Sequence, residues 1–549
     1  MFRKVIKKIK LSGFQNNKQK TFKDKTTQDK TTQDKTTQDK TSKDTQPLSK
    51  DLKVNLNSIK AVFENCSDIV IREFKIGVEQ QIEAFLVMVD GLVDKIAVNE
   101  SLMKSLMLDA RLAQPNRDIN KNNAYMFVKE CALSVASVKE VRSLEDAVDA
   151  ILSGDAALFI DGSDAALIVS IRGWETRGVD EPDTEAVVRG PREGFVETLR
   201  TNTALLRRKI KNPNLKLEPM KIGKQTKTDV CVAYIKGIAN DKIVREVKKR
   251  LQRIETDSIL ESGYIESFIE DAPFSLFPTV GNSEKPDIVG SKMLEGRVAI
   301  LVDGTPFVLT VPHLFVEAFQ SSEDYYSRPF YATFIRWLRW LAFFMSVFLP
   351  AMYVAVVTFH QELLPPALLV TIAAAGEGTP FPAFVEAFMM QVIYEILREG
   401  GVRLPRPIGQ AVSIVGALVI GEAAVSAGLI GAPMVVVVAL TAISSFVVPA
   451  LSDVSALSRL LILIMAGISG QFGIMLGIAG ILTHLCSIRS FGVPYTSPLA
   501  PATFSDMKDV FIRVPWWAMF TRPRVLGVKN PVREKFGQMP KPPEDDTKN

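Results

Sequence analysis

The fold of this chain is decided by a long apolar run, LAFFMSVFLPAMYVAVVTF, at residues 341–359. Two further runs follow it. Residues 423–452 carry no charge and are broken only by Gly-Ala-Pro at 431–433, and residues 460–488 carry none apart from His484. A helix needs about 20 apolar residues to cross the hydrocarbon core of a bilayer, and soluble core helices rarely need runs this long. The sequence therefore predicts an integral membrane protein.

The distribution of charge divides the chain into a polar part and an apolar part. Residues 1–330 are charged throughout, whereas residues 340–490 hold only a few ionisable groups, so the net charge of +5 and the 47% hydrophobic content describe neither part. The N-terminus is basic and lacks the apolar segment of a signal peptide. We therefore expect roughly the first 330 residues to remain in the cytosol.

A disordered basic tail is predicted at residues 1–50. Lysines are interspersed with apolar residues in the first eleven positions, which fits either a short amphipathic helix on anionic lipid or a solvated tail. The pentapeptide Asp-Lys-Thr-Thr-Gln then repeats from Asp24, Asp29 and Asp34. The repeat contains nothing apolar that a folded unit would bury, so we expect a disordered spacer.

A soluble α/β region follows, with two predicted subdomains at residues 51–180 and 181–325. Three short apolar runs, each a predicted strand, end in the turn dipeptide Asp-Gly: 84–91, 156–162 and 298–304. The last of them leads directly into another apolar run at 306–311, which is a strong hairpin signal. Helices are predicted at 57–64, 94–108, 144–152 and 241–253, and the polar stretch 177–191 is the predicted junction.

The soluble region shows no recognisable catalytic or cofactor-binding motif. It has neither a GxxxxGK[ST] phosphate loop nor GxGxxG, and the cysteines and histidines of the chain are scattered without metal-site spacing. Asp90, Asp161 and Asp303 precede glycine after a strand, so turn residues are a better interpretation than metal ligands. The loop 189–195 contains two arginines and is either an anion site or, as we prefer, a loop held by Arg–carboxylate pairs. We expect no enzyme activity, no cofactor and no nucleic-acid partner.

The membrane domain is placed at residues 326–490 and a cytoplasmic C-terminal tail at 491–549. Aromatic and basic residues at 325–340 suit the headgroup level, with the arginines on the cytoplasmic side. The first span therefore runs outward from about Phe334, and a kink is expected at Pro350.

Four spans are predicted in all, the later three at 408–429, 434–451 and 460–487. Residues 363–382 are too broken by proline and glycine to span a bilayer, and irregular backbone at membrane depth survives only when it is buried in protein or faces water. We therefore interpret this segment as re-entrant or pore-lining. If residues 383–397 crossed as a fifth span, the basic C-terminus would lie outside, against the positive-inside rule, so four spans are preferred.

Carboxylates inside the predicted membrane domain are the main functional candidates, because such groups by default face water, a partner charge or a functional path. Glu377 is assigned a function, while for Glu422 a function and an interhelical hydrogen bond remain equally open. Asp453 and Arg459 are placed in a loop and interpreted as solvated. The candidate pore and gating residues are Glu362, Pro365, Pro366, Leu369, Glu377 and Glu422.

Five glycines form a stripe in the last predicted span. Their spacings of 3, 3, 4 and 3 residues put them on one helix face: Gly467, Gly470, Gly473, Gly477 and Gly480. Small residues on one face let another helix approach closely. We prefer this packing role to direct lining of a conduit.

Several motifs together resemble the A subunit of GerA-type spore germinant receptors. They are LPPALL at 364–369, GEGTPFP at 376–382, REGGVRLPRPIGQ at 398–410, IVG at 414–416 and HLCSIRSFGVPY at 484–495. The loop 189–195 and the hairpin 296–311 also resemble the soluble part of that family. The resemblance covers about residues 55–525 and leaves out the tail repeat. The family commonly has Arg where this chain has Gly376, a departure that changes the charge next to Glu377.

The resemblance implies a multi-pass protein of the inner membrane of endospores, with the soluble region and the C-terminus on the core side. It implies that A subunits assemble, as a proposed pentamer, into a nutrient-gated ion channel that triggers germination. The implied partners are a permease-like B subunit, which recognises the nutrient, and a lipoprotein C subunit. Carboxylates around the broken segment would favour cations. The residues themselves leave two other interpretations open: a non-conducting membrane scaffold and, less favoured without an internal repeat, a secondary transporter.

Overall fold

The computed structural model describes residues 46–76, 82–109, 124–129, 138–173, 182, 185, 187–403, 421–527 and 529–540. Several predictions fall outside these residues. They are the basic tail with its repeats up to residue 45, part of the predicted junction 177–191, and most of the predicted span 408–429.

The first soluble subdomain is built on a five-stranded antiparallel sheet. Its strands, in order across the sheet, are β1 (Ile69–Ile76), β2 (Ile82–Val89), β4 (Ala156–Ile160), β5 (Ala166–Val169) and β3 (Val138–Val141). Successive side chains of a strand point to opposite faces, and helices cover both faces here. Phe85 and Val87 of β2 pack with α2 (Leu52–Val62) and α6 (Leu144–Leu152), while Ala84 and Leu86 pack with the π-helix η1 (Val98–Asp109).

The predicted strands and the helix at 144–152 are confirmed, whereas two predicted helices differ in detail. α2 begins at Leu52 rather than near residue 57, because the side chain of Asp51 caps it by accepting a hydrogen bond from the Lys53 amide at 2.9 Å. The helix predicted at 94–108 is a single turn, α3 (Lys95–Ala97), that continues as η1. A short helix, α5 (Ala124–Phe127), completes this subdomain.

The second subdomain repeats the topology of the first. Its strands, again in order across the sheet, are β6 (Leu215–Ile222), β7 (Thr228–Ile235), β9 (Val298–Val302), β10 (Val308–Val311) and β8 (Gly281–Ser283). In both sheets the first, second, fourth, fifth and third strands lie side by side, and every described pairing is antiparallel. The predicted β9–β10 hairpin is confirmed.

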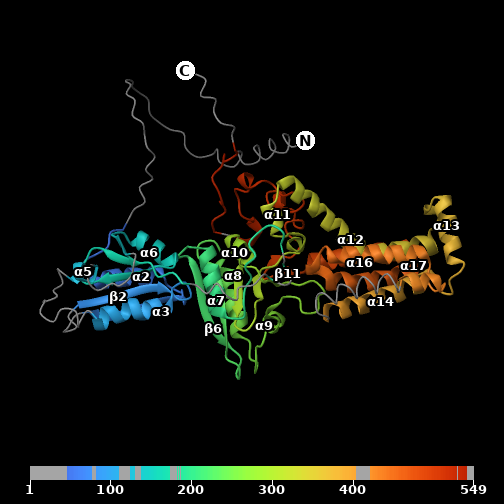
Figure 1. Ribbon diagram of the computed structural model, residues 1–549. Helices are drawn as coiled ribbons and strands as arrows, with labels where there is room; N and C mark the ends of the chain where they lie inside the picture. Colours follow the sequence, from blue (N-terminus) through green and yellow to red (C-terminus); the bar gives the residue numbers. More distant parts are fainter. Residues whose placement is uncertain are drawn as a thin grey trace, which may run out of the picture. The chain divides into compact units, whose positions relative to one another are not determined.

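Helices also cover both faces of the second sheet (Figure 1). α7 (Leu199–Lys209) and α10 (Pro286–Leu294) pack on one face, and α8 (Asp241–Gln252) and α9 (Ser262–Ile269) pack on the other. α8 was predicted at 241–253 and is confirmed. The soluble region therefore consists of two sandwiches of helix, antiparallel sheet and helix.

A buried ion pair joins the two subdomains. The guanidinium of Arg207 on α7 donates to both carboxylate oxygens of Asp68, at 2.8 and 2.9 Å, and neither side chain is more than 1% exposed. Arg207 also donates to the carbonyls of Asn212 and Leu215, so its charge is well solvated by protein groups. Breaking such a pair by removing one partner typically costs about 3–5 kcal/mol.

Among the described residues, the helices that follow the soluble region include α12 (Pro329–Phe359), α13 (Pro366–Gly376), α14 (Ala383–Arg403), α16 (Ala432–Phe446) and α17 (Ser452–Ser487), and residues 421–426 are also helical. By length and composition, two helical segments are apolar enough to cross a membrane, Pro329–Phe359 and Pro449–Ser487. Figure 1 shows α12, α14, α16 and α17 lying side by side, with α13 at one end of this bundle.

α17 is folded back on itself at Gly470. The backbone there has φ 58° and ψ −135°, which is not helical and lies in a region that favours glycine. A Cβ on Gly473 would lie 2.1 Å from the carbonyl oxygen of Met465, and one on Gly477 would lie 3.3 Å from Ile462. Residues so far apart in the sequence could not meet in a straight helix with a 1.5 Å rise per residue. The single span predicted at 460–487 is therefore wrong: the segment is a helical hairpin.

Four glycines of the stripe make close contacts, two of them within this hairpin. Gly473 and Gly477 bring the two arms together, and Gly470 forms the tip. Gly467 lies against the ring of Phe384 on α14, whereas a Cβ on Gly480 would meet nothing within 4 Å among the described residues.

The bundle has two distinct ends. Val454 and Leu485, at the beginning and end of α17, pack in one cluster with Phe315 and Phe319 of the soluble region, which defines the soluble end. The hairpin tip at Gly470 lies against Phe359 at the end of α12, which defines the distal end.

α14 runs through the bundle from the distal end to the soluble end. Phe384 near its start lies against Gly467 close to the hairpin tip, while Arg398 near its other end pairs with Asp453 at the beginning of α17. The prediction that residues 383–397 stay at one side is therefore wrong for this bundle. α12 itself is one helix that contains Pro350, with no separate break into two elements.

The segment after α17 also differs from the predicted tail. Its strands β11 (Arg489–Ser490) and β12 (Val493–Pro494) form a small hairpin. Phe491, Val493 and Val510 are buried in the core between the second sheet and α8. Residues 488–527 are thus folded onto the second subdomain, and the chain returns to the soluble region after the bundle.

Candidate functional site

Five of the six predicted pore residues, all but Glu422, lie in or beside the broken segment at the distal end. A 3-10 turn (Gln361–Leu363) follows α12, Pro365 is the N-cap residue of α13 and Pro366 its first helical residue, where a missing N–H does no harm. Leu369 faces a cavity of about 210 Å³ between α13, α12 and α14. The segment therefore forms a short ordered helix rather than an irregular loop.

Every residue of α13 is at least partly exposed in the single chain, although the helix is strongly apolar. Its eleven residues correspond to only about 16 Å of helix, too short to cross a bilayer. Val370 is 68% exposed and Leu368 46% exposed. An apolar helix with this much free surface needs lipid or another protein chain around it.

The carboxylates chosen from the sequence are exposed, whereas Glu386, which is not among them, is buried. Glu362 has a side chain that is 72% exposed and lies 3.4 Å from His360, and Glu377 and Glu422 are also exposed. Glu386 on α14, by contrast, is only 5% exposed. The sequence could have pointed to Glu386, because it lies on the predicted helix 383–397. The preferred four-span topology kept that helix out of the crossing segments, so the residue was not selected.

Charge is strongly polarised along the bundle. Residues 341–397, 421–458 and 460–488 contain no Lys or Arg. The described arginines of the bundle, among them Arg336, Arg398 and Arg459, lie toward the soluble end. The distal half holds carboxylates without a Lys or Arg among its described residues: Glu362, Glu377, Glu386 and Glu422.

Arg459 is buried and paired, so its interpretation as a solvated loop residue is wrong. It is 1% exposed and forms an ion pair with Glu395 of α14. It also donates to the backbone carbonyl of Ser346 at 3.2 Å. In a regular helix the N–H of residue 350 would donate to the carbonyl of residue 346. Pro350 has no N–H, and the guanidinium of Arg459 supplies the missing donor. A buried charge in an apolar bundle thus has both an ionic partner and a backbone acceptor.

A second network of charges holds the beginning of α12 to the C-terminal region. Asp324 is 2% exposed and accepts from Arg336 at 2.9 Å and from Arg339 at 2.8 Å. Arg336 also donates to the side chain of Asp509 at 2.8 Å and to its carbonyl at 2.6 Å. This cluster ties the first helix of the bundle to both soluble segments that flank the bundle.

Tyr325 and Arg513 extend the same network. The Tyr325 hydroxyl donates to Asp509 at 2.8 Å, and its carbonyl accepts from Arg513 and from the Trp516 indole, each at 3.1 Å. Burial, together with the negative charge of Asp509, raises the pKa of Tyr325 well above its usual value. Tyr325 therefore remains a neutral hydrogen-bond donor at any physiological pH.

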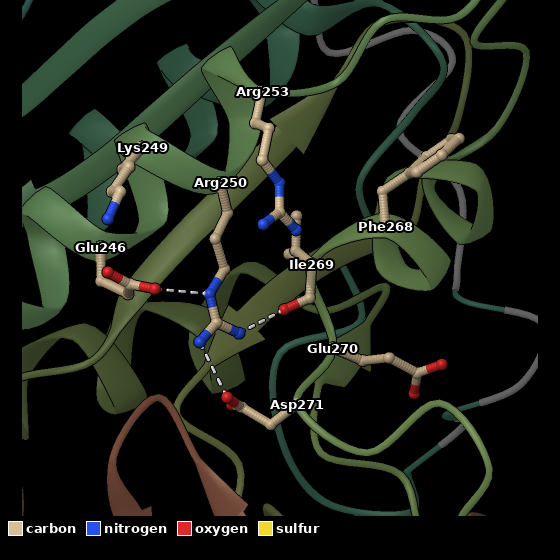
Figure 2. A pocket seen from close by; sticks show the side chains of 8 residues that line it. All are labelled: Glu246, Lys249, Arg250, Arg253, Phe268, Ile269, Glu270 and Asp271. Atoms are coloured by element: carbon tan, nitrogen blue, oxygen red, sulfur yellow. Dashed lines mark hydrogen bonds and ion pairs between the residues drawn. The ribbon is translucent and has the colours of Figure 1, made fainter.

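Figure 2 shows a groove of about 270 Å³ beside α8 in the second subdomain. Arg250 crosses it, donating to Glu246 at 2.9 Å, to Asp271 at 2.7 Å and to the Ile269 carbonyl at 2.6 Å. Asp271 in turn accepts from the amide of Phe491, whose ring lies under the Arg250 guanidinium. The guanidinium of Arg250 is fully paired, and its contacts join α8 to the segment that follows α17.

Carboxylates hold the loop 189–195: its own Glu193 pairs with Arg208 at 3.0 Å, as expected of a loop held by Arg–carboxylate pairs. Glu323 accepts hydrogen bonds from the backbone amides of Val188 and Arg189. Asp303, one of the predicted turn residues, accepts from the Leu199 amide at 2.9 Å at the start of α7. Among the residues that the structure describes, no group of three or more His, Cys, Asp and Glu side chains is placed to hold a metal ion.

Comparison with known proteins identifies the family. The family described as "Bacillus/Clostridium GerA spore germination protein" matches residues 57–525. The chain belongs to the GerA family. "Spore germination protein KA" of Bacillus subtilis (strain 168) is 50% identical over 90% of this chain and 90% of its own length. "Spore germination protein GerLA" of Bacillus cereus is 39% identical over 84% of this chain and 93% of its own length.

The resemblance stated from the sequence is thereby confirmed. A crystal structure of the N-terminal domain of the A subunit of the Bacillus megaterium spore germinant receptor GerK3 is 43% identical. It covers 50% of this chain and 99% of that domain, with a TM-score of 0.40. In this GerA-family chain the motif at 376–382 forms the end of α13 and its turn, and a Cβ on Gly376 or Gly378 would meet nothing within 4 Å among the described residues.

Proposed function

We propose that this chain is the A subunit of a nutrient germinant receptor and forms, with further copies of itself, a nutrient-gated cation channel in the spore inner membrane. It acts in signalling, without catalysis. The observation that carries the proposal is α13, a short apolar helix that the single chain leaves uncovered, with Glu362 just before it and Glu377 directly after it.

Symmetry explains how α13 helices from several subunits would line one ion path. In a ring of subunits, proposed as a pentamer, one α13 from each copy would face a common axis. Glu362 and Glu377 would then form rings of carboxylates, a device by which channels favour cations. Leu369 and its apolar neighbours between the two rings would close the path by excluding water.

The polarised charge supports the proposed topology. Cytoplasmic segments of membrane proteins carry an excess of Lys and Arg, so the soluble end of the bundle lies on the cytoplasmic, or core, side. From there the chain passes outward in α12, back in α14 and back again in α16, and the hairpin α17 adds two more passes. The intervening outward pass is the span predicted at 408–429, most of which lies outside the described residues. Six passes, instead of the predicted four, also return the C-terminus to the side of the soluble region.

The proposed partners are further copies of this chain, a permease-like B subunit that recognises the nutrient, and a lipoprotein C subunit. The network around Asp324 offers a route for the signal, because it links the soluble region directly to α12, which leads to the 3-10 turn before α13.

Ion flux from liposomes that contain the full-length chain with its partner subunits tests the proposal. Leu369→Ala enlarges the gap beside α13 and is expected to produce a constitutive leak, at least tenfold above wild type without nutrient. Leu461→Ala is the matched control, because Leu461 is 51% exposed on α17 and away from α13. If neither variant leaks and wild type never conducts with nutrient present, the chain is a non-conducting scaffold.

A further inference from the structure

Glu386 is a buried carboxylate without a cationic partner among the described residues. It lies in the first turn of α14, is 5% exposed and lines the distal cavity of about 210 Å³. Its one described hydrogen bond is long, 3.5 Å from the amide of Gly431. On the same helix the next basic residue is Arg398, twelve positions and therefore about 18 Å away.

A second source of negative potential points to the same place. A Cβ on Gly431 would lie 3.8 Å from Oε2 of Glu386 and 3.6 Å from the carbonyl oxygen of Ala375. Ala375 belongs to the last turn of α13, where unpaired carbonyls give a helix a partial negative charge. A carboxylate and the negative end of a helix therefore converge beside one glycine.

The surroundings supply more oxygen atoms but no cationic side chain, and the N-termini of α14 and α16 beside Glu386 contribute only partial positive charge. Tyr353, Gln361 and Thr379 line the cavity, and each has a side-chain oxygen. An isolated ionised carboxylate in an apolar environment is strongly unfavourable unless a cation compensates it. Neighbouring segments 341–397 and 421–458 contain no Lys or Arg that could do so.

We propose that the cavity beside α13 binds one small monovalent cation, an alkali metal ion or an ammonium group, on Glu386 and the Ala375 carbonyl. A single carboxylate matches a single positive charge, whereas divalent ions prefer several carboxylates. The cavity is smaller than the 300–1,000 Å³ typical of sites for larger organic ligands. The site is complete within one chain and does not depend on the proposed channel.

Equilibrium binding of radioactive ²²Na⁺, ⁸⁶Rb⁺ and ¹⁴C-methylammonium to the purified full-length chain in detergent tests the site, with N-methylglucamine as the background cation. Wild type is expected to bind about one ion per chain saturably. Competition among the three ions then separates an alkali-metal site from an ammonium site. Glu386→Gln is expected to weaken binding at least tenfold, while Asp453→Asn, which removes a carboxylate that is 94% exposed at the soluble end, leaves binding unchanged.

Gly431→Val provides a second variant, because its methyl groups would occupy the space between the two oxygens while keeping the carboxylate. It is expected to weaken binding as strongly as Glu386→Gln, and the melting temperature of each variant shows whether it is folded. Absence of saturable binding to wild type between pH 6 and pH 8 would overturn the proposal. Undiminished binding to either folded variant would overturn it as well.

Discussion

Arg459 donates a hydrogen bond to the carbonyl of Ser346, the acceptor that Pro350 leaves without its helical donor. The same guanidinium pairs with Glu395 on α14, so one side chain joins three helices of the bundle. Replacing it with Met is expected to lower the free energy of unfolding by about 3 kcal/mol, because the Ser346 carbonyl loses its donor and Glu395 keeps only Arg398 as an ionic partner. Denaturation of the detergent-purified chain measures this loss.

Pro350→Ala is the second substitution of a double-mutant cycle with Arg459→Met. Alanine restores the N–H that bonds the Ser346 carbonyl, so Arg459→Met is expected to cost less in the Pro350→Ala background, by about 1 kcal/mol. Strictly additive effects of the two substitutions would show that Arg459 does not serve this carbonyl.

The hairpin of α17 predicts that substitution by alanine changes the stability of the folded chain very differently at two glycines of the same stripe. Gly473→Ala would place a Cβ 2.1 Å from the Met465 carbonyl, so the two arms must separate and the folded chain is expected to be lost or strongly destabilised. Gly480→Ala meets nothing described within 4 Å and is expected to leave the melting temperature unchanged or raise it. Equal melting temperatures for the two variants would contradict the hairpin.

The network around Asp324 predicts that the soluble region and the bundle are tightly joined. Asp324→Asn leaves Arg336 and Arg339 without a shared counter-charge, and we expect a loss of about 3 kcal/mol together with faster proteolysis of residues 488–527. Asp453→Asn is the control, since Asp453 is 94% exposed and lies 3.9 Å from Arg398. If both substitutions are silent, the network does not secure the junction.

Glu266 on α9 predicts a pH-dependent stability. Burial, and then the negative charges of Glu270 and Glu261, raise the pKa of Glu266 to about 7 from its usual value of 4.5. The folded state therefore holds a proton between these two values that the unfolded state has released, so stability falls as pH rises from 4.5 to 7. Glu266→Gln is expected to remove about 1 kcal/mol of this dependence, measured as the change in unfolding free energy between pH 5 and pH 8. An unchanged slope would show that Glu266 titrates normally, and Glu255→Gln on the exposed surface is the control.

Much of the soluble fold follows from local sequence. Apolar runs that end in Asp-Gly at positions 91 and 304 specify strands and turns without reference to the rest of the chain. The shared topology of the two subdomains does not, because strand order depends on contacts between distant segments such as Val230 and Val302 of β7 and β9 or Val308 and Ser283 of β10 and β8.

The bundle was harder to predict, since hydropathy does not distinguish one long span from a tight hairpin. Gly470 and Gly473 lie in an unbroken apolar run, and only the left-handed backbone at one and the close approach at the other show the fold-back. Likewise the pairing of Arg459 with Glu395 depends on the path of α14 through the bundle. The positive-inside rule, applied to the sequence alone, had placed α14 outside the crossing segments.

The central claim, that α13 and its flanking carboxylates line a cation path, is tested most directly by ion selectivity. Liposomes that contain the Leu369→Ala chain with its partner subunits are expected to release K⁺ at least tenfold faster than Cl⁻, and adding Glu377→Lys is expected to abolish this preference. K⁺ and Cl⁻ release at equal rates, or a preference that Glu377→Lys leaves intact, would contradict it.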